Sequence, residues 1–203
     1  NNSEEPSVRR LGAILLGVML AAVGLAAPAS AILPPVDGYY TFHQDGLPDA
    51  KWQMQSICIQ ANGTRAQPDY TDETIQTLGC DVLLGSSTQP PLTRETKLVN
   101  FSARAKLTGG LWTFQIGQSQ GVACPDGSFA PSTDTFSFTA PDPNGPPNLT
   151  GTHTSIHDAV CGLQAAMTKA PFTLTFTDVL DPSVVARFPA LCNYLVGRPS
   201  ICA

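Results

Sequence analysis

The sequence predicts a mainly β protein: an antiparallel β-sandwich or barrel, stapled by disulfides, with one or two short helices towards the C-terminus. Three observations predict this fold class. Several segments alternate apolar and polar residues with a period of two, which is typical of half-buried strands. Runs rich in Gly, Pro, Asn and Asp separate these segments and indicate turns. All six cysteines follow an N-terminal export signal, so we expect them to pair.

The first 31 residues have the three parts of a secretory signal peptide. Arg9 and Arg10 form a short basic region, residues 11–27 are apolar and uncharged, and Ala29-Ser30-Ala31 supplies the small residues that a signal peptidase requires. We therefore expect cleavage after Ala31 and a secreted or cell-envelope protein. The alternative is that the apolar segment is retained as a membrane anchor. Residues 32–203 are predicted to form a single secreted β-rich domain.

The predicted strands follow the segments of alternating polarity. The clearest hairpin lies within residues 96–116, where two alternating runs flank Thr108-Gly109-Gly110, a turn in which positive φ is easily adopted. Residues 140–148 are too rich in proline for regular structure. The full set of predicted strands is 38–42, 51–61, 80–84, 99–107, 111–116, 133–139, 149–156 and 171–178.

Two segments have helical character. Residues 158–169 place Val160, Leu163 and Met167 on one helical face, although Gly162 weakens the pattern. Asp181-Pro182 has the residues of a helix N-terminus. Residues 178–203 are therefore predicted to be a short helical tail that a disulfide pins.

Nearest-neighbour pairing is the simplest disulfide framework for the six cysteines. The alternative, a metal site, is disfavoured because the chain has no C-x-x-C motif and contains three histidines in all. The predicted pairs are Cys58–Cys80, Cys124–Cys161 and Cys192–Cys202.

The charge pattern excludes nucleic acid as a partner. The net charge is −5, and the 11 basic residues are scattered rather than clustered. A nucleic-acid surface needs a positive patch to neutralise phosphates, and none is present in the sequence.

Ser119 lies in Gly117-Gln118-Ser119-Gln120-Gly121, the G-x-S-x-G pattern of serine hydrolases. In those enzymes a helix begins directly after the nucleophile and helps to bind the oxyanion. Here Cys124 and Pro125 follow within a few residues, so no helix can begin there. The simpler interpretation of Ser119 is a surface β-turn, and no catalytic residue is expected.

The alternative function is a secreted serine esterase that uses Ser119. Its acid would be Asp126, Asp134 or Asp142, and its base His153 or His157.

His153 and His157 also form H-x-x-x-H, which on a helix could bind one metal ion. In the predicted strand, positions four apart are separated by more than about 12 Å, so exposed strand histidines are expected instead, with no metal and no cofactor.

An ordered series of short motifs resembles a family. The series includes Gly38-Tyr39-Tyr40, Leu107 to Phe114, Cys124 to Gly127, Leu149-Thr150-Gly151 and Cys161-Gly162, and it ends at Pro171 to Leu174. Over about 38–177 the chain is similar to small exported proteins of mycobacteria and related actinobacteria whose function is unassigned. This resemblance implies a secreted or envelope β-domain, suits a Cys124–Cys161 pair, and supplies no catalytic residues.

Together these observations predict a non-enzymatic exported β-domain. Its binding or structural role would involve a lipid, glycan or protein partner. If a ligand pocket exists, aromatic side chains are expected to line it, although the same residues would also make an ordinary core. These residues are Tyr39, Tyr40, Trp52, Trp112, Phe114, Phe136 and Phe138.

Overall fold

The computed structural model describes residues 34–59, 65–66, 80–139, 145–181 and 183. The predicted signal peptide, residues 1–31, lies outside the described residues, and so does most of the predicted helical tail. Among the residues described, no helix is long and apolar enough to cross a membrane.

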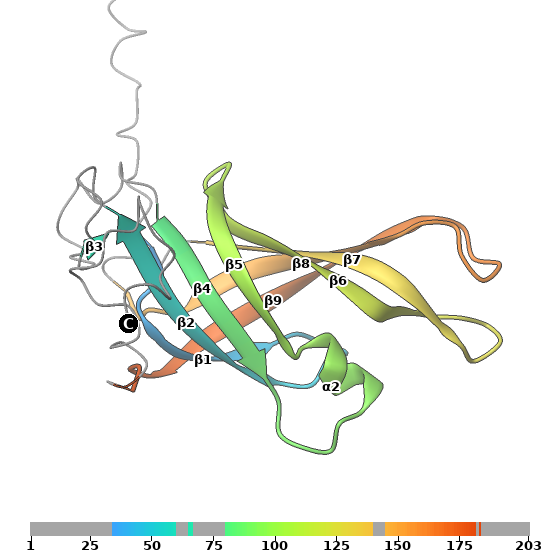
Figure 1. Ribbon diagram of the computed structural model, residues 1–203, viewed down its shortest axis with the longest axis horizontal. Helices are drawn as coiled ribbons and strands as arrows, with labels where there is room; N and C mark the ends of the chain where they lie inside the picture. The colour runs from blue at the N-terminus through green and yellow to red at the C-terminus, as the bar shows by residue number, and fades with distance from the viewer. Residues whose placement is uncertain (1–33, 60–64, 67–79, 140–144, 182, 184–203) are drawn as a thin grey trace, which may run out of the picture. The chain divides into compact units, whose positions relative to one another are not determined.

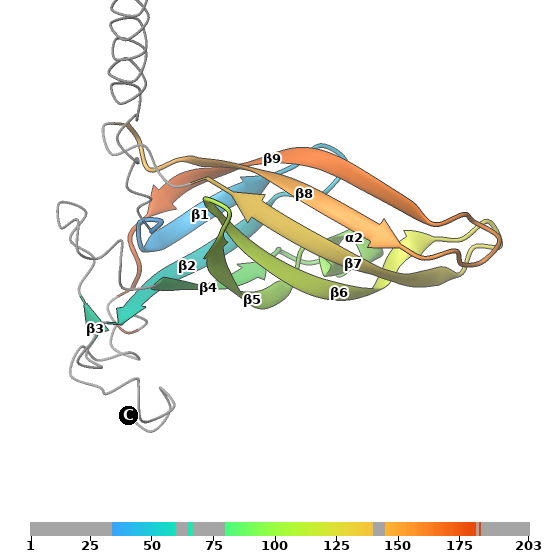
Figure 2. The same cartoon turned by 90° about the horizontal axis from the view of Figure 1, so that it is seen from above.

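Residues 32–203 contain a closed antiparallel barrel of eight strands (Figures 1 and 2). Apart from the two-residue β3, which pairs with the end of β2, the strands follow one another around the barrel in chain order. The first and last strands, β1 and β9, also pair, and this pairing closes the sheet. The strands are β1 Gly38–His43, β2 Ala50–Ile59, β3 Arg65–Ala66, β4 Cys80–Ser87, β5 Phe101–Thr108, β6 Leu111–Ala123, β7 Phe129–Phe138, β8 Leu149–His157 and β9 Ala166–Asp178. The predicted fold class is confirmed, and the architecture is the barrel rather than the sandwich.

Aromatic side chains fill the barrel interior. Because neighbouring residues of a strand point to opposite faces, every second side chain points inward. An eight-stranded barrel is just wide enough for such side chains to fill it. Trp52 is fully buried, and its ring stacks on that of Phe42 with centroids 5.2 Å apart. The buried cluster consists of Tyr40, Phe42, Ala50, Trp52, Met54, Val82, Leu84, Val99, Ala105, Trp112, Phe114, Phe136, Phe138, Leu149, Phe172 and Leu174.

The barrel wall is incomplete between β5 and β6, and a short helix fills the gap. These two strands pair at three positions only, Lys106–Thr113, Leu107–Trp112 and Thr108–Leu111. The helix α2 (Arg94–Leu98) lies beside β6 where β5 has diverged from it. Thr93 caps this helix in a capping box with Thr96. The sequence pattern missed α2, because a five-residue helix has too few residues to show a helical period.

Two of the three predicted disulfides are present. Cys58–Cys80 joins directly opposed residues of β2 and β4. Cys124–Cys161 joins the turn of the β6–β7 hairpin to that of the β8–β9 hairpin, and these hairpins extend beyond the other strands (Figures 1 and 2). The third predicted pair, Cys192–Cys202, lies outside the described residues. Bonds of this kind are compatible with an oxidising location.

The helix predicted over residues 158–169 is wrong. Residues 158–165 form a turn closed by a Val160–Leu163 bridge, and β9 begins at Ala166. The apolar spacing has another cause: Val160 and Leu163 cover a small cluster of Val122, Cys124 and Ala130 at the hairpin ends. Pairing of residues 166–170 with β8 outweighs their helix propensity, because the tertiary structure supplies a complete row of strand partners.

The fold makes a prediction about Gly151, which lies in β8 against the ring of Phe172. A Cβ atom there would overlap this ring and lie 2.6 Å from the carbonyl oxygen of Ser137. We expect Gly151→Ala to lower the free energy of unfolding by about 1–3 kcal/mol, the cost of overpacking a filled core. Denaturant unfolding measures this change. Gly117→Ala is the matched control, since a Cβ at Gly117 meets open space, and equal losses in both variants would contradict the packing described.

Candidate functional site

Ser119 lies on the outer face of the barrel, within β6. The side chain is exposed, and β6 continues past it to Ala123. The surface turn expected at this position is therefore wrong: the residues form a strand with a register shift between Gln118 and Val122. Such a bulge changes the direction of the strand and leaves local backbone groups without ladder partners.

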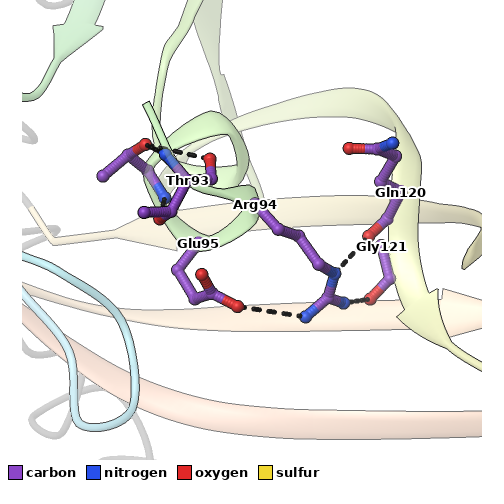
Figure 3. A network of polar contacts seen from close by, with 6 residues as sticks. Thr93, Arg94, Glu95, Gln120 and Gly121 are labelled. Atoms are coloured by element: carbon purple, nitrogen blue, oxygen red, sulfur yellow. Dashed lines mark hydrogen bonds and ion pairs between the residues drawn. The ribbon is translucent and has the colours of Figure 1, made fainter. Parts of the chain in front are cut away.

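Arg94 satisfies the backbone at this bulge. Its Nε donates to the carbonyl oxygen of Gln120 at 2.9 Å, and its Nη2 donates to that of Gly121 at 2.8 Å (Figure 3). Gln118 Nε2 also donates to the carbonyl oxygen of Leu98 in α2, at 2.8 Å. The G-x-S-x-G segment is therefore part of a strand held by α2, and β6 continues after Ser119 where a serine hydrolase would begin a helix.

His153 belongs to a buried polar cluster and not to a triad with Ser119. Its Nε2 lies 3.3 Å from Asp134 Oδ2, within ion-pair range although not aligned as a hydrogen bond. Its Nδ1 lies 3.1 Å from Oε1 of Gln44, in the β1–β2 loop. The ring stacks on Phe136 with centroids 4.2 Å apart. The His153 side chain is 11% exposed, so the expectation of an exposed strand histidine is wrong here.

Asp134 carries the negative charge of this cluster. Its residue is 4% exposed, and Ser132 Oγ donates to its Oδ1 at 3.0 Å. Burial by itself would raise the pKa of this carboxyl, but the His153 imidazole and the hydroxyls of Ser155 and Ser132 outweigh burial and hold the pKa below its ordinary value. The carboxylate therefore stays ionised inside the barrel wall.

The other proposed catalytic groups are not gathered around Ser119. Asp126 lies in the β6–β7 turn, where hydrogen bonds from Ser128 lower its pKa. His157 Nδ1 contacts the carbonyl oxygen of Asp158 at 2.8 Å. Asp142 lies outside the described residues. In the part of the chain that the structure describes, no imidazole or carboxylate makes a hydrogen bond to the hydroxyl of Ser119.

Metal-ligating side chains do not cluster either. Across the described ranges, no three His, Cys, Asp or Glu side chains lie together in a way that could hold a metal ion.

Six of the seven aromatic residues considered as pocket lining belong to the core. Tyr40, Trp52, Trp112, Phe114, Phe136 and Phe138 are all buried. Tyr39 differs, because its side chain points out of the barrel, and the ammonium group of Lys51 lies 3.7 Å from the centre of its ring. A cation–π contact of this kind holds both side chains in place over the surface.

Beside Tyr39 the outer wall is hollowed, with a volume of about 350 Å³. The hollow lies over Gly85, which is paired with Gln53 of β2 on one side and Ser102 of β5 on the other. A Cβ at Gly85 would meet open space, so the missing side chain leaves room over the strand. The lining consists of Tyr39, Lys51, Gln53, Gly85, Ser86, Ser87, Phe101 and Ser102. Sequence alternation places Lys51 and Gln53 on the same face of a strand, but it does not show that Gly85 lies between Gln53 and Ser102.

Comparison of the chain with protein-family models, curated proteins and solved structures finds no match.

The buried cluster makes stability depend on pH. The pKa of Asp134 is lower in the folded protein than in the unfolded chain. The Asp134 carboxylate therefore stabilises the fold fully at pH values above the pKa of the unfolded chain. This stabilisation is lost as the pH falls from that pKa to the lower pKa of the folded protein. We expect Asp134→Asn to lower the free energy of unfolding at pH 7 by about 1.5–3 kcal/mol, the usual value of hydrogen bonds to a charged group. The difference in the free energy of unfolding between Asp134→Asn and wild type should become smaller at acidic pH. Urea unfolding at a series of pH values measures it. A constant difference would contradict this role of the charge.

The exposed strand position of Ser119 makes a second prediction. We expect no labelling of the oxidised protein by a fluorophosphonate probe, because no base activates the hydroxyl. Ser119→Ala should leave the labelling unchanged. Stoichiometric labelling that disappears in Ser119→Ala would instead establish the esterase alternative.

Proposed function

We propose that this protein is an exported, non-enzymatic binding domain that holds a saccharide in the hollow over Gly85. The observation that carries this proposal is the filled interior of the barrel. Trp52, Phe136 and their neighbours occupy the space in which a wider or emptier barrel would hold an apolar ligand. A partner is therefore bound on the outside, and this disfavours a lipid carried within the barrel.

The chemistry of the lining favours a saccharide. Gln53, Ser87 and Ser102 supply amide and hydroxyl groups that both donate and accept hydrogen bonds, as the hydroxyls of a sugar require. Tyr39 and the apolar stem of Lys51 add a small apolar surface beside these groups. The volume of about 350 Å³ lies at the lower end of the range for small-molecule sites, which suits one or two sugar rings.

Catalysis has no comparable support. His153, whose side chain is 11% exposed, contacts Asp134 and Gln44 inside the barrel wall. The hollow itself is lined by no histidine, aspartate, glutamate or cysteine. Binding without chemistry is the function that its lining supports best.

Filling the hollow tests the proposal. We expect Gly85→Val to abolish saccharide binding while leaving the melting temperature within a few degrees of wild type, because the added side chain enters open space on a strand that favours β-branched residues. A glycan array identifies the bound saccharide, and isothermal titration calorimetry then compares the variants.

Gly117→Val is the matched control, since it adds the same side chain to open space on β6, outside the hollow. It should bind as wild type does. Equal binding by the two variants would show that the hollow is not the site, and no binding to any saccharide by the wild type would refute the function.

A further inference from the structure

Lys51 places one positive charge in the hollow, and no acidic residue lines it. No described residue forms a salt bridge with this ammonium group, which lies 3.7 Å from the centre of the Tyr39 ring. The acid nearest along the chain is Asp49, whose Oδ1 lies 2.7 Å from Nδ1 of His43. Asp178, paired with Tyr39 on β9, accepts from the backbone nitrogen of Val179. Within the described part of the chain, the charge of Lys51 is therefore not neutralised by the protein.

The surroundings of Lys51 distinguish it from an ordinary surface lysine. Contact with the Tyr39 ring restricts the position of the ammonium group, which reduces the entropy that an exposed lysine loses when it binds an anion. The ammonium group has three N–H donors. The Tyr39 ring is a weaker acceptor for them than a negatively charged oxygen would be. Lys51 is therefore a cation held at a concave polar surface.

The strand register fixes where an anionic group would lie. Lys51 pairs with Ser87 and Gln53 with Gly85, so both pairs share the outer face of β2 and β4. Positions two apart on a strand are separated by about 7 Å. A sugar ring over Gly85 can therefore contact Gln53 and Ser102 while an acidic substituent reaches Lys51 and the hydroxyl of Ser87.

We propose that the saccharide bound in this hollow is acidic, and that its carboxylate or phosphate group binds the ammonium group of Lys51. This inference rests on the proposed function and names the ligand class of the same hollow. The hydroxyl-bearing ring contacts Gln53 and Ser102, and the anion neutralises the one charge of the lining.

The test compares each acidic sugar with a neutral counterpart that has the same ring hydroxyls. The oxidised chain from Ile32 onward is titrated calorimetrically with digalacturonate, with its methyl ester, with glucose 6-phosphate and with glucose. We expect an acidic sugar to bind about fivefold more tightly than its neutral counterpart, the size of a partly exposed charge interaction. The preference should weaken as salt is raised. Whether the uronate or the phosphate shows the preference identifies the anionic group.

Variants of Lys51 separate this inference from the function on which it rests. Lys51→Gln should remove the preference for the acidic sugar, Lys51→Arg should keep it, and Lys169→Gln, an exposed lysine on β9 outside the hollow, should change nothing. If charged and neutral sugars bind equally, or if Lys51→Gln keeps the preference, the hollow is a saccharide site and the inference is wrong. If none of the four ligands binds and the glycan array is also empty, the proposed function fails with it.

Discussion

The ring of Trp52 contacts aromatic rings from five other strands: Phe42, Phe101, Phe114, Phe136, Phe138 and Phe172 lie with centroids 5.2–6.3 Å from it. Rings at these distances attract one another beyond the burial of their surface. Strands from opposite parts of the barrel are thus held through one side chain. The filled interior follows directly from this packing, and it leaves the outer surface as the place where a ligand can bind.

Polar groups appear where the barrel departs from a uniform wall. Beside the gap between β5 and β6, the bulge of β6 leaves carbonyl groups without ladder partners, and the guanidinium of Arg94 binds two of them. Its positive charge also lies over the ring of Phe129, with Cζ 4.9 Å from the ring centroid. An open strand edge is a site for unwanted pairing with other chains, so this cover by α2 protects the fold as well as completing it.

Glycine has opposite roles at two positions of the barrel. Gly151 allows the ring of Phe172 to approach the backbone of β8 from the inside. Gly85 removes a side chain from the outside and leaves a hollow between longer neighbours. Tight packing inside and an open surface outside therefore both depend on missing Cβ atoms, on opposite faces of the same sheet.

Local patterns in the sequence determined the strands and their faces. Alternation over residues 51–61 predicts a strand, and β2 spans Ala50–Ile59 with Trp52 and Met54 on one buried face, because side-chain direction in a strand depends on parity. Close spacing along the chain sufficed for both disulfides, since Cys58–Cys80 joins two paired strands and Cys124–Cys161 joins two successive hairpins. The tertiary structure decided closure, because β1 and β9 are separated by most of the domain and nothing local records their pairing. It also decided that residues 166–169 extend as a strand, that His153 is buried against Asp134, and that Gly85 opens a hollow. Each of these depends on partners from distant strands, and a local pattern carries no information about which distant residues those partners are.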